Sequence, residues 1–191
     1  METKEKILHE AVKLFAQKGY TGTSMNDIAS RLGVTKAALY KHYSGKEEIL
    51  TSIIKKMNDM DKVRAEKYSM PNAEIPEAVE DYKNMAFEKI KTYTQAQFLH
   101  WTKEEFPCDF RKMLTLEQYR DNDMRELYQN YLACGPLNYM KDVFKEFTKD
   151  GEKAYSLALD FYGVIFLLYS IYDSGEDMQR VLDAIRILKR L

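Results

Sequence analysis

Hydrophobic residues recur with the period of an α-helix along most of the chain. The first stripe, at i, i+4 and i+7 or i+8, consists of Ile7, Leu8, Ala11, Val12, Leu14 and Phe15. It predicts a helix that ends at Gly19, because glycine readily adopts the left-handed conformation that caps a helix C-terminus. A second, short helix is predicted to follow Ser24, whose spacing from Asp27 is that of a capping box, and to end at Gly33.

Two further helices are predicted before residue 70. Thr35 is the expected N-cap of a third helix, from Lys36 to about Tyr43. Ser44 and Glu47 repeat the capping-box pattern. They precede a long amphipathic helix that is expected to cover Lys46 to about Lys67.

The rest of the chain keeps the helical period and shows no alternation of the kind that predicts strands. Helices are predicted from Glu77 to about Trp101 and from Met113 to Cys134, the second in one or two pieces. Breaks are expected at 106–108 and at 135–136, because proline and glycine interrupt helices. Three more helices complete the chain, the last two joined at Ser174–Gly175. The pattern therefore predicts an all-α protein.

The composition changes this picture little but excludes several classes of protein. With 8 Gly and 4 Pro in 191 residues, the chain is neither collagen-like nor a turn-dense β-sandwich. Its two cysteines, Cys108 and Cys134, are too few for a disulfide framework and are expected to be ordinary thiols. The longest apolar run, Val164–Tyr169, falls far short of the ~20 residues that span a bilayer. Since no signal peptide is visible either, a cytoplasmic protein without membrane contact is expected.

Charge is distributed unevenly along the chain. Residues 1–50 carry 8 Lys and Arg against 6 Asp and Glu, a net charge of +2, while residues 51–191 carry 21 against 24, a net charge of −3. This asymmetry favours a nucleic-acid partner for the first segment but is too small to establish one. The pattern of elements divides the chain into an N-terminal domain at 1–46 and a helical domain at 47–191.

Residues 24–43 have the form of a helix-turn-helix. A small residue, Ala29, would let two short helices cross closely, and Gly33 would supply a positive φ in the turn. Val34, Leu39 and Tyr43 are expected to anchor the second helix in the core. The opposite face would then be free for the major groove of DNA. It consists of Thr35, Lys36, Ala37, Tyr40 and Lys41.

Any small helical hairpin with a solvated face would show the same spacing, but a resemblance favours DNA binding. Residues 1–50 resemble the DNA-binding domain of the TetR family of transcriptional regulators. The matching stretches are Ile7–Phe15, Gly19–Ser24, Asp27–Ala29, Leu32–Lys36, Leu39–Tyr43 and Lys46–Leu50. The resemblance covers about a quarter of the chain and implies that the third helix enters the major groove.

The resemblance also implies roles for single residues. The positions of Lys36 and Tyr40 would reach bases or phosphates. Phosphates would be held by Thr23, Ser24, His42 and Lys46. For Lys46 this role has a physical basis, because a helix N-terminus already attracts an anion. His42 has an alternative role as a cation that stabilises the C-terminus of the third helix.

In this family the remaining helices form a ligand-binding and dimerisation domain, which is expected to be a helical bundle here. Aromatic residues and methionines at helical spacing are first of all core residues, but they can also line an apolar pocket. Candidate pocket residues are Phe98, Trp101, Met113, Tyr119, Tyr131, Tyr162 and Phe166. The last two helices have wide apolar faces and are expected to form a homodimer interface. Candidate interface residues are Phe161, Ile165, Leu168, Tyr172, Val181, Ile185 and Leu188.

These features together predict a repressor that binds a pseudo-palindromic double-stranded DNA operator as a homodimer. A small-molecule effector, apolar or aromatic, would release it. An activator, or a DNA-binding regulator that acts without a ligand or under the control of a protein partner, would have the same sequence features. Three scattered histidines and two cysteines give no metal-ligand spacing, and no phosphate loop or nucleophile motif occurs. No cofactor, metal site or catalytic residue is therefore expected, and the protein is not expected to be an enzyme.

Overall fold

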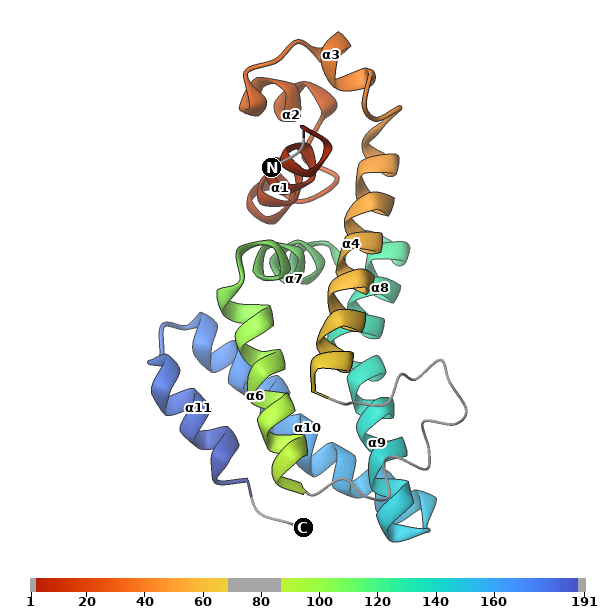
Figure 1. The fold of residues 1–191 in the computed structure, drawn as a ribbon, viewed down its shortest axis with the longest axis vertical. Helices are drawn as coiled ribbons and strands as arrows, with labels where there is room; N and C mark the ends of the chain where they lie inside the picture. Colours follow the sequence, from red (N-terminus) through yellow and green to blue (C-terminus); the bar gives the residue numbers. More distant parts are fainter. Residues whose placement is uncertain (1–2, 69–86, 189–191) are drawn as a thin grey trace. The chain divides into compact units, whose positions relative to one another are not determined.

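The computed structural model describes residues 3–68 and 87–188, which form helices and no strand (Figure 1). The all-α fold class is confirmed. The helices are α1 (Thr3–Lys18), α2 (Met25–Leu32), α3 (Lys36–Tyr40), α4 (Lys46–Lys67), α6 (Phe87–Lys103), α7 (Glu105–Glu117), α8 (Asn122–Leu132), α9 (Cys134–Thr148), α10 (Gly151–Asp173) and α11 (Met178–Arg186).

The chain forms two compact units, and neither is continuous in sequence. The first unit contains residues 1–63 and 104–128, and the second contains residues 64–103 and 129–191. Helices α4 and α8 each contribute residues to both. The boundary expected between residues 46 and 47 separates a DNA-binding domain from a ligand-binding and dimerisation domain, and it stays a prediction.

The core of the first unit forms around α1. Its predicted stripe, Ile7 to Phe15, is buried at every expected position. Helix α1 packs on α2 and on α7, and α7 contributes the buried side chains of Phe106, Phe110 and Met113. The helix-turn-helix segment therefore shares its core with a helix that lies more than 50 residues further along the chain.

Two predicted helix breaks lie two residues earlier than expected, at Glu104 and Ala133. Helix α6 runs on to Lys103 and α7 begins at Glu105, so Pro107 lies in the first turn of a helix. Proline is tolerated there because the first backbone N–H groups have no partner within the helix. The same holds for Gly135 and Pro136, which lie in the first turn of α9. The predicted start at Glu77 lies outside the described residues.

The second unit is built on α6, α9, α10 and α11. Its core contains residues predicted at a dimer interface. Phe161, Ile165 and Leu168 of α10 are buried, as are Val181 and Ile185 of α11, and Tyr172 and Leu188 pack beside them. The five buried side chains fill the unit's own core, whereas Tyr172 and Leu188 are partly exposed; the assignment of these residues to a dimer interface stays a prediction.

Helix α10 is unusually apolar for its degree of exposure. It spans 23 residues and, by length and composition alone, could cross a membrane, yet only 33% of its most apolar window is buried. The side chains that remain exposed include Tyr155, Leu159, Phe166 and Leu167. On a helical projection these positions lie opposite the buried ones, with the exposed Gly163 among them.

Candidate nucleic-acid interface

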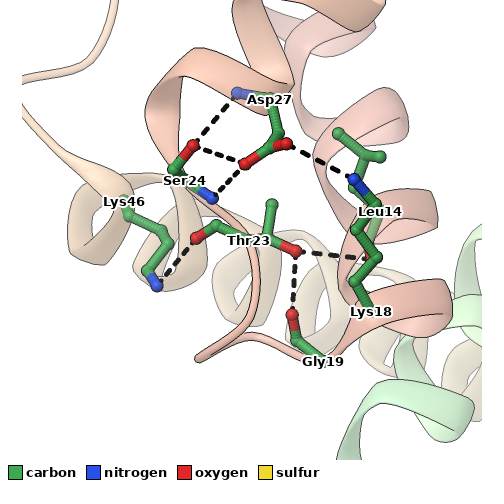
Figure 2. Close-up of polar contacts among 7 residues, drawn as sticks. All are labelled: Leu14, Lys18, Gly19, Thr23, Ser24, Asp27 and Lys46. Carbon is green, nitrogen blue, oxygen red and sulfur yellow. Dashed lines mark hydrogen bonds and ion pairs between the residues drawn. The ribbon is translucent and has the colours of Figure 1, made fainter.

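The N-terminus of α2 is closed by the predicted capping box. The Ser24 hydroxyl accepts a hydrogen bond from the backbone N–H of Asp27 at 3.2 Å, and the Asp27 carboxylate accepts one from the N–H of Ser24 at 2.9 Å (Figure 2). Lys18 lies 3.3 Å from the same carboxylate. The hydrogen bonds from Ser24, assisted by Lys18, lower the pKa of Asp27 to about 2. The start of α2 is therefore tied to the end of α1.

The turn and the third helix follow the helix-turn-helix pattern with one exception. Gly33 has a φ of 67° and its N–H caps α2, while Ala29 is buried at the helix crossing. Leu39 is fully buried and anchors α3 as predicted. Val34, however, keeps 44% of its surface exposed. It lies in the turn before the N-cap Thr35, where the chain has not yet entered the helix, and so it does not anchor α3.

The face of α3 that was predicted to meet DNA is exposed. Its members are Thr35, Lys36, Ala37, Tyr40 and Lys41. The Lys36 ammonium lies 5.7 Å from the centre of the Tyr40 ring, so the two side chains share one face. Within the part of the chain that the structure describes, neither Lys36 nor Lys41 forms an ion pair. By contrast, Lys18 and Arg31 lie within 3.3 Å of carboxylate oxygens. Figure 2 shows the Lys18 pair.

Two predicted phosphate-binding residues have their polar atoms engaged inside the protein. Thr23 is buried, and its hydroxyl donates to the carbonyl oxygen of Gly19 at 2.8 Å. The Lys46 ammonium donates to the carbonyl oxygens of Tyr20 and Thr23 at 2.8 and 2.9 Å and lies 4.3 Å from the centre of the Tyr20 ring. Both residues hold the turn between α1 and α2. The resemblance implies phosphate contacts for both residues and for the half-buried His42, whereas the hydrogen bonds of Lys46 favour a structural role for its ammonium group.

The hydrogen bonds of Ser44 differ from those of the predicted capping box. The Ser44 backbone N–H and hydroxyl both donate to Glu48, at 2.6 and 2.8 Å, rather than to Glu47. Since α4 begins at Lys46, Ser44 lies one residue before the N-cap position, and Glu48 is four residues from Ser44, one more than the spacing of a capping box. Glu47 instead hydrogen-bonds the phenol of Tyr20. Burial, together with the charge of Glu47, raises the pKa of Tyr20 to about 12.

The predicted pocket residues are divided between the two units. Phe98 and Trp101 are buried in the second unit. Trp101 lies edge-on to Tyr131, with 6.0 Å between the ring centres. Tyr162 donates to the carbonyl oxygen of Leu132 at 2.8 Å. Phe166, at 6.5 Å from Tyr162, keeps 42% of its surface exposed.

The other two pocket candidates belong to the first unit. Met113 is fully buried in its core, whereas Tyr119 keeps 88% of its surface exposed, which is not the position of a residue that lines an enclosed pocket. The pocket assignment as a whole stays a prediction. Glu117, at the end of α7, has no exposed surface and is not among the residues predicted from the sequence. One acid in an amphipathic helix gives no signal in the sequence.

The helix-turn-helix segment lies within a stretch of the chain that matches a known protein family. Residues 7–53 match the model of the family described as bacterial regulatory proteins, tetR family. A segment of 46 residues is 50% identical to IcaR of Staphylococcus epidermidis, a negative transcriptional regulator of a biofilm operon. That match covers 24% of this chain and 25% of IcaR, so only about a quarter of the relative's length is matched.

Solved structures share the fold over nearly the whole chain. A transcriptional regulator of the TerR/AcrR family from Aquifex aeolicus aligns with a TM-score of 0.64 and 20% identity, over 97% of this chain and 96% of that one. AibR, solved in complex with isovaleryl coenzyme A and operator DNA, aligns with a TM-score of 0.64 and 18% identity, over 96% of each chain. At these identities the likeness shows a common fold and nothing about ligands.

Proposed function

We propose that the chain is a regulator of the TetR family, which binds operator DNA in the cytoplasm and acts there as a transcriptional repressor, because residues 7–53 match the model of that family. The observation that carries the proposal is the exposed face of α3. Lys36 and Lys41 lie on it without a carboxylate partner among the described residues, beside the exposed ring of Tyr40. Unpaired cations suit phosphates, and a phenol with a small neighbour, Ala37, suits base edges.

Two copies of α3 would read one operator. In a two-fold dimer the recognition helices would enter successive major grooves about 34 Å apart, which corresponds to one turn of B-DNA. The operator would then be a pseudo-palindrome. Each α3 has only five residues, so a single copy offers few contacts, and pairing would supply the rest of the affinity.

The dimer contact is proposed on the exposed side of α10. Tyr155, Leu159 and Phe166 are each more than 40% exposed there, and Leu167 is 57% exposed. A contiguous apolar face of this kind on a protein surface marks an interaction site. Gly163 lies among them, and a Cβ built on it would meet no atom within 4 Å. A second copy of α10 could therefore approach closely at this point, and self-pairing satisfies the two-fold symmetry that the operator model needs.

A small molecule is proposed to release the DNA. The second unit holds dense aromatic packing, with Phe98 stacked on Tyr169 at 4.6 Å and Trp101 beside Tyr131. Such side chains suit an apolar or aromatic effector. AibR has been solved with an acyl-coenzyme A and DNA bound to the same protein. A tenfold loss of operator affinity requires about 1.4 kcal/mol of coupling, within the usual range for allosteric proteins.

Selection of bound duplexes from a random DNA pool tests the proposal. The wild-type protein should enrich an inverted repeat with half-site centres about one helical turn apart. A protein carrying Lys36→Ala and Tyr40→Ala should enrich nothing. If the wild type enriches no sequence even at low salt, where phosphate contacts are strongest, the DNA-binding proposal is wrong. An enriched repeat then serves as the probe for an effector screen.

A further inference from the structure

A buried carboxylate connects α7 to the turn between α1 and α2. Glu117, the last residue of α7, has no exposed surface. The Thr21 hydroxyl donates to its Oε2 at 3.0 Å, and Arg120 Nη1 lies 3.3 Å from its Oε1. A buried charge is tolerated only where such partners compensate its lost hydration. The contacts therefore fix the carboxylate in one place.

The turn is shaped around this carboxylate. Gly19 has a φ of 82°, a conformation that favours glycine, and a Cβ built on it would lie 2.0 Å from Glu117 Oε1. The carboxylate oxygen thus occupies the space that any other side chain at position 19 would need. The backbone conformation favours glycine at this position, and any other side chain there would have to displace the Glu117 carboxylate.

The same turn is held on its other side by α4. Lys46 donates to the carbonyl oxygens of Tyr20 and Thr23, which lie on either side of Thr21. The turn leads directly into Ser24, the N-cap of α2. Its geometry therefore decides where α2 begins, and with it the position of the residues at the proposed phosphate contacts.

We propose that Glu117 is a positioning residue for DNA binding. It holds the α1–α2 turn, and so the start of α2, in the geometry that fits the operator, without touching DNA itself. The inference rests on the proposed function and extends it to a residue far outside the matched segment 7–53.

The test compares Glu117→Gln with two variants of its partner. Glutamine keeps the shape but carries no charge and has one acceptor oxygen in place of two, so it cannot replace both the acceptor facing Arg120 and the acceptor facing the Thr21 hydroxyl. Thr21→Val removes the hydroxyl donor from an exposed position, while Thr21→Ser retains it. The matched control is Glu105→Gln at the other end of α7, where the carboxylate pairs with Lys13 of α1 at 2.7 Å and is 62% exposed. Operator affinity is measured on folded dimers over a range of salt concentrations.

Glu117→Gln and Thr21→Val should each weaken operator binding by ~10-fold, equivalent to about 1.4 kcal/mol. The slope of log K against log salt should stay unchanged, because no phosphate contact is lost. Thr21→Ser and Glu105→Gln should bind like the wild type. The double variant Glu117→Gln/Thr21→Val should be no weaker than either single variant, because both remove the same contact.

Amide hydrogen exchange provides a readout that does not require DNA. Residues 19–24 should exchange faster in Glu117→Gln and in Thr21→Val than in Glu105→Gln, even if the wild type binds no duplex at all. A lower melting temperature with unchanged exchange in the turn and unchanged operator affinity would assign Glu117 a merely structural role and overturn the inference. A reduced salt slope would overturn it as well, because a phosphate contact would then have been lost.

Discussion

The salt dependence of operator binding should separate the lysines that face DNA from the lysine that holds the fold. Lys36 and Lys41 have no carboxylate partner among the described residues, whereas the Lys46 ammonium donates to two backbone carbonyls at 2.8 and 2.9 Å. Each phosphate that a protein neutralises contributes about −0.9 to the slope of log K against log salt, because a counterion is released. The number of DNA-facing cations is therefore directly measurable.

The double variant Lys36→Ala/Lys41→Ala removes four cations from a dimer. Its slope should be shallower than that of the wild type by about 3.6. Between 50 and 200 mM salt this difference changes the ratio of the two affinities by ~100-fold, so the variant is most impaired at low salt. Lys46→Gln should weaken binding through the loosened α1–α2 turn but leave the slope unchanged.

Fluorescence anisotropy with a labelled operator duplex, titrated at several potassium chloride concentrations, measures these slopes. Circular dichroism confirms that each variant is folded at the assay temperature. The reasoning is refuted if Lys46→Gln lowers the slope by about 1.8, the value for one phosphate contact per protomer. It is equally refuted if the Lys36→Ala/Lys41→Ala protein keeps the wild-type slope.

Two further outcomes follow from the packing and from the charges. Leu167→Glu, at a position that is 57% exposed, should give monomers in sedimentation and lose operator binding. Leu168→Ala, at a core position that is 6% exposed, should stay dimeric and lose about 2–5 kcal/mol of stability. A dimeric Leu167→Glu protein would place the interface elsewhere. Because its folded-state pKa is lowered from 3.8 to about 2, Asp27 stabilises the protein above pH ~4 and loses this contribution as the pH falls toward 2. Urea midpoints measured from pH 5 to 2 should therefore fall less steeply in Asp27→Asn than in the wild type, and parallel curves would contradict the assignment.

The N-terminal third of the fold was predictable because its signals are local. The stripe of α1, the capping box of Ser24 and Asp27, and the positive φ of Gly33 each depend on residues within one or two helical turns. The exposed face of α3 followed from the same short-range spacing. A resemblance to a known family added roles for these residues but no new geometry.

The predictions failed where one local pattern is compatible with two structures, or where the surroundings of a residue depend on residues far away in the sequence. Proline and glycine can end a helix or begin one, and Pro107 and Pro136 begin theirs. The apolar stripe of α10 suits an intermolecular face as well as a core, and only the packing of α6, α9 and α11 shows that Phe161 and Ile165 face inward. Glu117 meets Thr21 across 96 residues, a contact that no periodicity reveals.

The packing of α7 on α1 bears on how such proteins can be recombined. A chimera that joins the first 46 or 63 residues to a foreign body would leave out Phe106, Phe110 and Met113, which are buried in the same unit as α1. The apolar side of α1 would then meet water or a surface that does not fit it. A transplantable DNA-reading module would instead consist of two separate stretches of chain, 1–63 and 104–128. Exchange of specificity between relatives should accordingly succeed more often by substitution on α3 than by fusion at the end of the matched segment.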